Sequence, residues 1–282
     1  MVNKLRVVSG NKSSLKRPFF YLCAKIIALW FICGGLWGIA WGKSPHWWRP
    51  GFIVDSFLEI ALKNEYSQSK GVIRKWTSEI RYVFDHRVGD EAFHEQMVEM
   101  HLRQLADITG ISIQPAASKT EANLQIVIST EQRLAVELKK DFHFGGQEAD
   151  YMLRHSVCLG QFSTTAQGAI RQAIVIIPVD RARASGKLVS CVVEELTQVM
   201  GLPNDSASVY PSIFNDQSIY ILLTGLDYVL LKTLYDPRLT PGMTSQQAAP
   251  VVRKIVDDFH RQHLIERAEQ LVGSGELYSL LY

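Results

Sequence analysis

The amino-acid sequence predicts an α+β domain with a twisted mixed sheet, a long helix beside the sheet and a mainly helical second half. Three observations lead to this fold class. A strand-like segment at 72–84 is followed by a long helix-forming run that ends at Gly110. Two short β-branched segments and one strongly apolar segment, 168–178, come next. Apolar residues recur at helical spacing in the last long run, 246–271.

The composition is that of one globular domain preceded by a targeting segment. The chain has 282 residues, of which 47% are hydrophobic and 21% are charged, and its formal net charge is +2. Residues 1–42 contain six basic residues and no acidic one, so residues 43–282 carry 24 basic against 28 acidic residues. A mildly acidic body argues against a nucleic acid as the partner.

The N-terminal segment predicts export. Residues 26–42 are uncharged and rich in Ile, Leu, Trp and Gly, which is typical of a signal peptide after a long basic region. Gly38–Ala40 and Ala40–Gly42 fit a small-x-small cleavage pattern. An uncleaved membrane anchor is the alternative, because residues 26–42 reach the lower length limit for spanning a bilayer. Both interpretations place the body in the periplasm or the extracellular space, with membrane contact only through this segment.

The cysteines agree with export. Cys23 and Cys33 fall in the targeting segment, which leaves Cys158 and Cys191 as the only pair in the body. An even pair in an oxidising compartment predicts a disulfide, which would join the segment before a strand to the start of a helix. Two buried free thiols are the alternative.

Residues 43–70 are expected to be a linker that holds one short helix. The segment contains Pro45 and Pro50, then an apolar run at 55–63 and a polar end. Proline interrupts regular structure, and the apolar run is long enough only for a short helix. We therefore place the start of the folded domain, 71–245, after this segment.

The sheet and its long helix are predicted from the residues that follow. Loose alternation of β-branched and aromatic residues predicts strands, and apolar residues at helical spacing predict the helix. The expected elements are a strand at 72–84, a helix from Gly89 to Gly110, strands at 111–113 and 124–128, an irregular polar stretch at 130–165 and a buried strand at 168–178. Residues 246–282 are expected to form an amphipathic helix that packs on the domain.

The helix predicted at about 188–200 carries the polar residues that point to a function. They follow the pattern E-E-x-x-Q-x-x-G-x-x-N-D at Glu194, Glu195, Gln198, Gly201, Asn204 and Asp205. Glu194 and Gln198 lie four residues apart, so they project from one face of the helix. Gly201 ends the helix, which would let the chain turn back at Asn204.

This spacing resembles that of the metzincin peptidases, which read H-E-x-x-H-x-x-G-x-x-H. The resemblance implies a zincin-like domain, with a long helix in the upper lobe and a mainly helical lower lobe. In those peptidases three histidines bind zinc and the central glutamate, here Glu195, polarises the attacking water. Glu194, Gln198 and Asn204 stand at the histidine positions. Phe214 stands where these peptidases have a methionine turn, so zinc proteolysis is not expected.

The chain also resembles a family of exported bacterial proteins with a domain of unknown function. Its signature is C-x-x-E-E-x-x-Q-x-x-G-L-x-N-D, here Cys191–Asp205. An S-x-F-N-D segment follows at Ser212–Asp216, and L-Y-D-P-x-L-x-P-G-M follows at Leu234–Met243. The resemblance covers about residues 71–245 and implies no established activity.

Two hypotheses concern a metal. One carboxylate and two carboxamides form an oxygen ligand set that suits Ca²⁺, Mg²⁺ or Mn²⁺ better than Zn²⁺, which makes Glu194, Gln198 and Asp205 candidate ligands of a divalent cation. In the other hypothesis no metal binds and the Gln198 amide donates to Glu194. We favour the second and expect no cofactor. Histidine pairs at helical spacing are expected to be solvated helix surface: His94 with His101, and His260 with His263.

The sequence therefore favours an exported pseudoenzyme that binds a peptide or a cell-envelope polymer through Glu194, Gln198, Asn204 and Asp205. The first alternative is a hydrolase, either a peptidase or a cell-wall enzyme, that uses Glu195 as its general base. Asp205 or Asp216 would then be the second acid, although both also suit turns. The second alternative is a structural component of an envelope complex.

Overall fold

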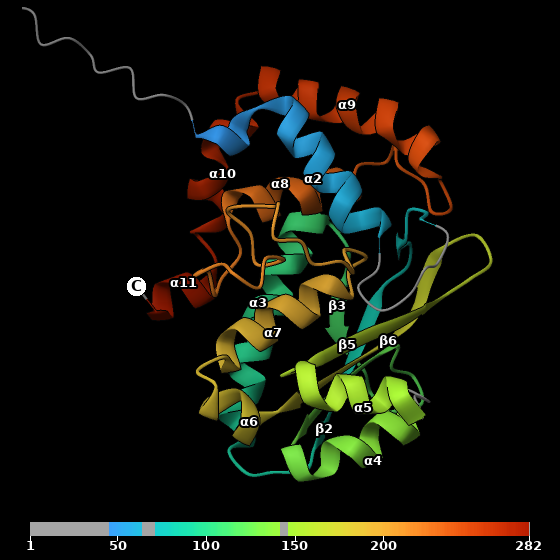
Figure 1. The fold of residues 1–282 in the computed structure, drawn as a ribbon, viewed down its shortest axis with the longest axis vertical. Helices are drawn as coiled ribbons and strands as arrows, with labels where there is room; N and C mark the ends of the chain where they lie inside the picture. The colour runs from blue at the N-terminus through green and yellow to red at the C-terminus, as the bar shows by residue number, and fades with distance from the viewer. Residues whose placement is uncertain (1–44, 64–70, 142–145, 282) are drawn as a thin grey trace, which may run out of the picture. The chain divides into compact units, whose positions relative to one another are not determined.

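The computed structural model describes residues 45–63, 71–141 and 146–281 (Figure 1). The predicted targeting segment, with its apolar run at 26–42, lies outside these residues. None of the helices in the described part of the chain combines the length and the apolar character needed to cross a bilayer.

A mixed sheet, which has six strands in the described residues, forms the centre of the domain. The strands are β1 (Lys75–Trp76), β2 (Ile80–His86), β3 (Ile113–Pro115), β4 (Leu124–Ser129), β5 (Leu159–Thr164) and β6 (Ala169–Pro178). Their order is β1-β6-β4-β2-β3, and β5 pairs with β6 as the antiparallel strand. Tyr82 stands opposite Leu124 and Leu124 opposite Ala173, so the parallel register runs through the three central strands. The α+β class is confirmed.

The helices lie around this sheet. They are η1 (His46–Trp48), α2 (Pro50–Leu62), α3 (Glu91–Thr109), α4 (Glu131–Asp141), α5 (Gly146–His155), α6 (Val179–Ala184), α7 (Leu188–Gln198), α8 (Gly225–Leu234), α9 (Ser245–Arg261), α10 (Leu264–Val272) and α11 (Glu276–Leu281). Helices α2 and α9 lie side by side at one end of Figure 1, and α4 and α5 lie together at the other. Helix α7 packs on α3.

The strand expected at 72–84 is two strands. The chain bends at 77–79, so β1 pairs with the start of β6 and β2 pairs with β3 and β4. The Trp76 indole donates to the carbonyl oxygen of Val199 over 2.9 Å. This bond holds β1 at the end of α7 instead of in line with β2.

Helix α2 is part of the core, although the sequence predicts a short helix within a linker. Ile53, Phe57 and Ile60 are fully buried, because their spacing places them on one face of the helix. The Arg74 guanidinium donates to the carbonyl oxygens of Ala61 and Lys63 over 3.4 and 3.0 Å, and so caps the carboxyl end of α2. The compact unit accordingly begins at Pro45.

The irregular stretch expected at 130–165 is instead α4, α5 and β5. Helices α4 and α5 carry more polar than apolar residues, which is why the sequence of this segment resembles a polar loop. Leu134, Met152 and Leu159 are buried with Val127 and Ile176 in a small hydrophobic cluster of their own. A tertiary cluster of this size orders a segment that is polar on average.

The long helix is confirmed, but its histidines are not on the surface. Helix α3 ends at Gly110, whose φ of 74° is the left-handed conformation of a helix terminus. His94 is 1% exposed and His101 is completely buried. The His101 ring nitrogen Nε2 lies 3.1 Å from the Val193 carbonyl oxygen and 3.0 Å from the Thr197 hydroxyl. His101 therefore packs α3 against α7.

The C-terminal segment is three helices and not one. His263, with a φ of 54°, separates α9 from α10, and a turn at 273–275 separates α10 from α11. Helix α9 packs on α2, whereas α10 packs on α8. His260 and His263 are exposed, as predicted.

Candidate functional site

Helix α7 places its apolar face in the core and its polar face beside strand β5. Val192 and Leu196 are fully buried, whereas Glu194 is half-buried. Glu195 and Gln198 are each 9% exposed, so both side chains are nearly enclosed. The helix that the sequence places at about 188–200 is thus present and ends two residues earlier.

The turn after α7 requires the glycine of the motif. Gly201 has a φ of 114°, and a Cβ atom at this position would lie 2.0 Å from the carbonyl oxygen of Arg74 in the segment leading into β1. Neither condition suits a residue with a side chain. The Tyr235 hydroxyl, just after α8, donates to the carbonyl oxygen of Met200 over 2.8 Å. The turn is therefore fixed by both β1 and α8.

The polar face of α7 lines a small pocket of about 80 Å³, which we call the α7 pocket. Most of the predicted site residues meet here, together with the disulfide: Glu194, Glu195, Gln198, Asp205, Asp216, Cys158 and Cys191. Residues from the end of α5, the segment that follows it, the start of β5 and the segment before α7 complete it: His155, Ser156, Val157, Leu159, Gly160 and Lys187.

Three carboxylates of the α7 pocket lie close together. Glu194, Asp205 and Asp216 each offer one oxygen, and these oxygens all lie within 4.8 Å of one another. Glu194 and Asp205 are half-buried and Asp216 is exposed. Asp216 was expected in a turn, and the turn is present, because Asn215 Oδ1 accepts from the Gln217 N–H over 3.0 Å. The turn also places Asp216 in the lining of the α7 pocket.

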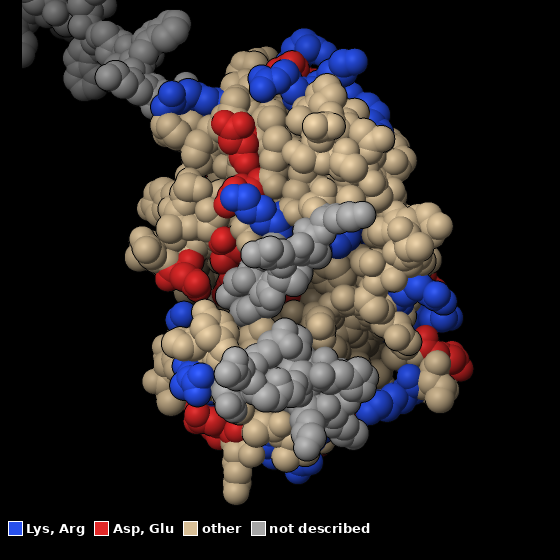
Figure 2. Space-filling model, turned by 45° about the vertical axis from the view of Figure 1, so that its right-hand side comes forward, with Lys and Arg blue, Asp and Glu red and all other residues tan. Residues whose placement is uncertain are grey.

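Acidic side chains are visible as a surface feature in Figure 2. On the face drawn there, Asp and Glu side chains form a broken column, and a Lys or Arg side chain lies against it. A basic side chain beside the carboxylates reduces their mutual repulsion.

Two predicted contacts are wrong. The Gln198 amide donates to Asp205 Oδ1 over 3.0 Å, and not to Glu194. Asn204 does not line the pocket. Its amide donates to the carbonyl oxygen of Glu59 over 3.2 Å, so its side chain faces the end of α2. Because of this contact with α2, Asn204, at the third histidine position of the metzincin pattern, is turned away from Glu194 and Gln198.

The disulfide between Cys158 and Cys191 is confirmed, with a Cα–Cα distance of 5.8 Å. It joins the residue before β5 to α7, one turn ahead of Glu194 and Glu195. Two residues after Cys158, an added Cβ on Gly160 would lie 2.9 Å from Glu195 Oε2 and 3.2 Å from the Glu195 carbonyl oxygen. The β5 backbone therefore lies directly on Glu195, and a larger residue at position 160 would displace the Glu195 side chain.

The segment after the motif is anchored by an aspartate that no sequence pattern singled out. Asp227 is fully buried and accepts from the Ser212 hydroxyl, the Ile213 N–H, and both the N–H and the hydroxyl of Thr224 over 2.6–3.1 Å. Burial raises the pKa of this carboxyl to about 6, against the opposing effect of these donors. Phe214, at the position of the methionine turn in the resemblance, is fully buried and forms part of the core.

His155 and Lys187 are pocket residues that sequence reasoning missed. His155 is exposed at the end of α5, and its ring lies 4.5 Å from that of Tyr151. Helix α5 lies in a segment that is polar on average, and nothing in the sequence placed its last residue beside α7. The only usable signal was the predicted disulfide, because Cys158 lies three residues after His155.

A protein-family model described as a protein of unknown function, DUF2927, matches residues 50–254. The match begins at the start of α2 and includes every residue of the α7 pocket. It ends within α9. No curated protein matches the chain.

Proposed function

The chain belongs to the DUF2927 family of proteins of unknown function, and we propose that its α7 pocket binds a peptide or a cell-envelope polymer without cleaving it. One observation carries the proposal: an edge strand, β5, runs along a pocket lined by acidic side chains. Within the described residues β5 pairs only with β6, so its other edge offers backbone N–H and C=O groups. An extended peptide can add to such an edge.

The polar groups beside this edge suit recognition. Glu194, Asp205 and Asp216 present carboxylates at one end of β5, within the α7 pocket. Carboxylates bind ammonium and guanidinium groups, and they accept hydrogen bonds from sugar hydroxyls. A basic peptide and an envelope glycan therefore both fit the chemistry of the pocket.

The absence of catalysis is supported by how the motif residues are engaged. Gln198 donates to Asp205, and Asn204 faces α2. The three positions that hold zinc in the metzincins thus do not converge as ligands. Glu195 is 9% exposed beneath β5, which leaves little room for a water molecule and a substrate carbonyl beside its carboxylate.

The zincin-like fold and the exported location are parts of the same proposal. A helix with a polar face under the edge of a mixed sheet, a glycine turn and a following helix, α8, support the fold. The disulfide supports export, because such bonds persist in oxidising compartments. We place the protein in the periplasm or outside the cell, either free or held by residues 26–42.

The test is binding by the full-length chain. Purified protein is incubated with insoluble peptidoglycan and, separately, with an immobilised library of extended peptides. A double variant, Glu194→Gln with Asp205→Asn, should lose binding. The matched control Asp257→Asn removes an exposed carboxylate of α9 outside the pocket and should bind like the wild type. Equal binding by all three proteins would refute the pocket as the binding site.

A hydrolase is the second candidate function. The observation in its favour is that three carboxylate oxygens lie within 4.8 Å of one another, which fits the oxygen ligands of Ca²⁺, Mg²⁺ or Mn²⁺. Glu194, Asp205 and Asp216 would hold the cation, and Glu195 would be the general base. The cation would supply Lewis-acid polarisation of the scissile bond.

Two measurements separate these functions. Metal analysis of the purified chain and turnover of peptides and peptidoglycan are compared between wild type and Glu195→Gln. Stoichiometric metal together with turnover that Glu195→Gln abolishes would replace the binding proposal with the hydrolase. The structural alternative, a component of an envelope complex, predicts neither turnover nor a ligand in the α7 pocket.

A further inference from the structure

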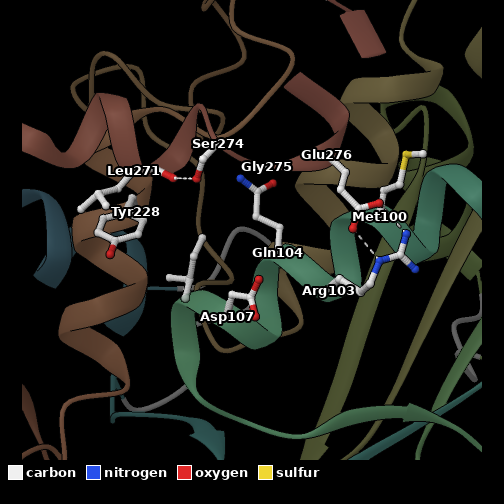
Figure 3. Close-up of a pocket in the computed structure, with 10 residues that line it drawn as sticks. Met100, Arg103, Gln104, Asp107, Tyr228, Leu271, Ser274, Gly275 and Glu276 are labelled. Carbon is white, nitrogen blue, oxygen red and sulfur yellow. Dashed lines mark hydrogen bonds and ion pairs between the residues drawn. The ribbon is translucent and has the colours of Figure 1, made fainter. Parts of the chain in front are cut away.

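A second pocket, of about 200 Å³, lies where helices α3, α8, α10 and α11 meet (Figure 3). None of its residues lines the α7 pocket. Its walls come from α3, from Tyr228 of α8, and from the turn that joins α10 to α11. This volume is below the usual range for drug-sized ligands, so the pocket suits a molecule of few atoms.

One wall is built rigidly. Arg103 donates to Glu276 through two bonds of 2.8 and 2.7 Å, which fastens α11 to α3. Gln104 is 8% exposed and donates to the carbonyl oxygen of Val272 over 2.8 Å. A Cβ on Gly275 would lie 2.3 Å from the Gln104 amide nitrogen, so a larger residue here would displace the Gln104 amide.

The opposite wall is aromatic and aliphatic. In Figure 3, Tyr228 and Leu271 lie across the pocket from the Arg103–Glu276 pair. Ile108 adds a further apolar side chain. The Tyr228 hydroxyl forms no hydrogen bond to another described residue, and burial raises the pKa of this phenol.

The electrostatics of the pocket are negative. Asp107 lies in the last turn of α3, where the helix dipole disfavours a carboxylate, and no basic residue accompanies it there. It makes no hydrogen bond or ion pair with the described residues. The carboxyl end of α10 reaches the same pocket through Leu271. Two helix carboxyl ends and an unpaired aspartate therefore meet here, together with the amino end of the short helix α11, whose positive dipole end the Glu276 carboxylate offsets.

Nearby positive charge does not offset this field. The Arg103 guanidinium is neutralised by Glu276. Arg267 is close enough to oppose the rise in the Tyr228 pKa, but it is exposed to solvent and does not line the pocket. Solvent screens both Arg267 and Asp107, which is exposed as well, but only Asp107 lines the pocket.

We propose that this pocket binds a small primary ammonium group carried on a short apolar chain. The ammonium would pair with Asp107 and lie near the face of Tyr228. The negative carboxyl ends of α3 and α10 would also attract it. The apolar chain would pack on Ile108 and Leu271. The site is independent of the function proposed for the α7 pocket.

The test uses the full-length chain labelled with ¹³C at its methionine methyl groups, because Met100 lines the pocket. The Met100 signal is assigned with Met100→Leu, and n-butylammonium chloride is titrated at constant ionic strength. We expect a saturable shift of this signal. 1-Butanol, which has the same chain without the charge, should shift it less and without saturation.

Asp107→Asn keeps the shape of the side chain and removes its charge, and it should weaken n-butylammonium binding about fivefold, as loss of one exposed ion pair would. Asp257→Asn, an exposed helical aspartate outside the pocket, is the matched control and should bind like the wild type. A titration with Nα-acetyl-lysine N-methylamide distinguishes a lysine side chain from a free amine as the natural source of the ammonium. Equal affinity for butanol and butylammonium, unchanged affinity in Asp107→Asn, or no saturable shift would overturn the proposal.

Discussion

Replacement of His101 should remove a large part of the acid sensitivity of the fold. His101 is completely buried between α3 and α7, and burial lowers the pKa of its imidazole from 6.5 to about 4. The hydrogen bonds with Val193 and Gln104 oppose this shift and are outweighed by burial. The native protein therefore keeps this ring neutral at a pH where the unfolded chain has already bound a proton.

The sign and size of the effect follow from this difference. Between pH 6.5 and pH 4 the unfolded state binds more protons, so the free energy of unfolding falls as the pH falls. At 1.36 kcal/mol per pKa unit, His101 lowers the free energy of unfolding by about 3 kcal/mol over the whole interval. About 2 kcal/mol of this is already lost at pH 5. His101→Gln retains an amide donor near the position of Nε2 and cannot titrate.

The assay is urea unfolding of the full-length chain, followed by tryptophan fluorescence at pH 7.5 and pH 5. The measured quantity is the stability of the wild type minus that of His101→Gln at each pH. Asp227, which has the opposite effect on the wild-type profile, is present in both proteins and cancels. We expect the difference to decrease by about 2 kcal/mol on acidification. His263→Gln, whose side chain is 79% exposed, serves as the matched control. If His101→Gln and the wild type lose stability in parallel, the reasoning is refuted.

Three further predictions concern stability. Because the pKa of Asp227 is raised from 3.8 to about 6, the wild type should lose about 3 kcal/mol as the pH rises through this interval, and Asp227→Asn should abolish that loss in the same urea assay. Replacement of Cys158 and Cys191 together by alanine should lower the free energy of unfolding by about 3–4 kcal/mol, as expected for a loop closed over 33 residues; a double variant as stable as the oxidised wild type would contradict this. Gly201→Ala should destabilise the protein by about 3 kcal/mol or more, because a methyl group would overlap the carbonyl oxygen of Arg74; calorimetry with an unchanged melting temperature would count against it.

Strong periodicity made part of the fold predictable. Helix α3 and helix α7 each have apolar residues at helical spacing, and Gly110 and Gly201 mark where the chain leaves them. The disulfide followed from the number of cysteines in the body. These features depend on residues close together in sequence, or on a pairing with only one solution.

The remaining elements depend on tertiary contacts that a single sequence does not reveal. Helices α4 and α5 are polar on average, so their pattern resembles that of a polar loop, although Leu134 and Met152 are buried. Helix α2 has an apolar face, but the flanking prolines pointed to a linker. Its partner, α9, lies almost two hundred residues later in the chain.

In the candidate site, too, local geometry was predictable from the sequence and tertiary placement was not. The common face of Glu194 and Gln198 follows from helix geometry and was predictable. The direction of Asn204 was not, because it depends on carbonyl groups at the end of α2. Asp216 enters the pocket through a turn of the segment that Asp227 anchors to α8, and no local pattern encodes that route.

The contacts made at the start of the short strand β1 limit where a recombinant fragment of this domain can begin. Arg74 needs the carbonyl groups of Ala61 and Lys63, while Lys75 donates to the carbonyl oxygens of Leu234 and Asp236 over 3.0 and 3.2 Å. A recombinant fragment that starts at residue 71 lacks α2. The buried Arg74 guanidinium would then lose its hydrogen-bond acceptors, and the hydrophobic face that α2 covers would be exposed to solvent. Expression should begin upstream of Pro45, since trimming to the strand boundaries would yield insoluble protein.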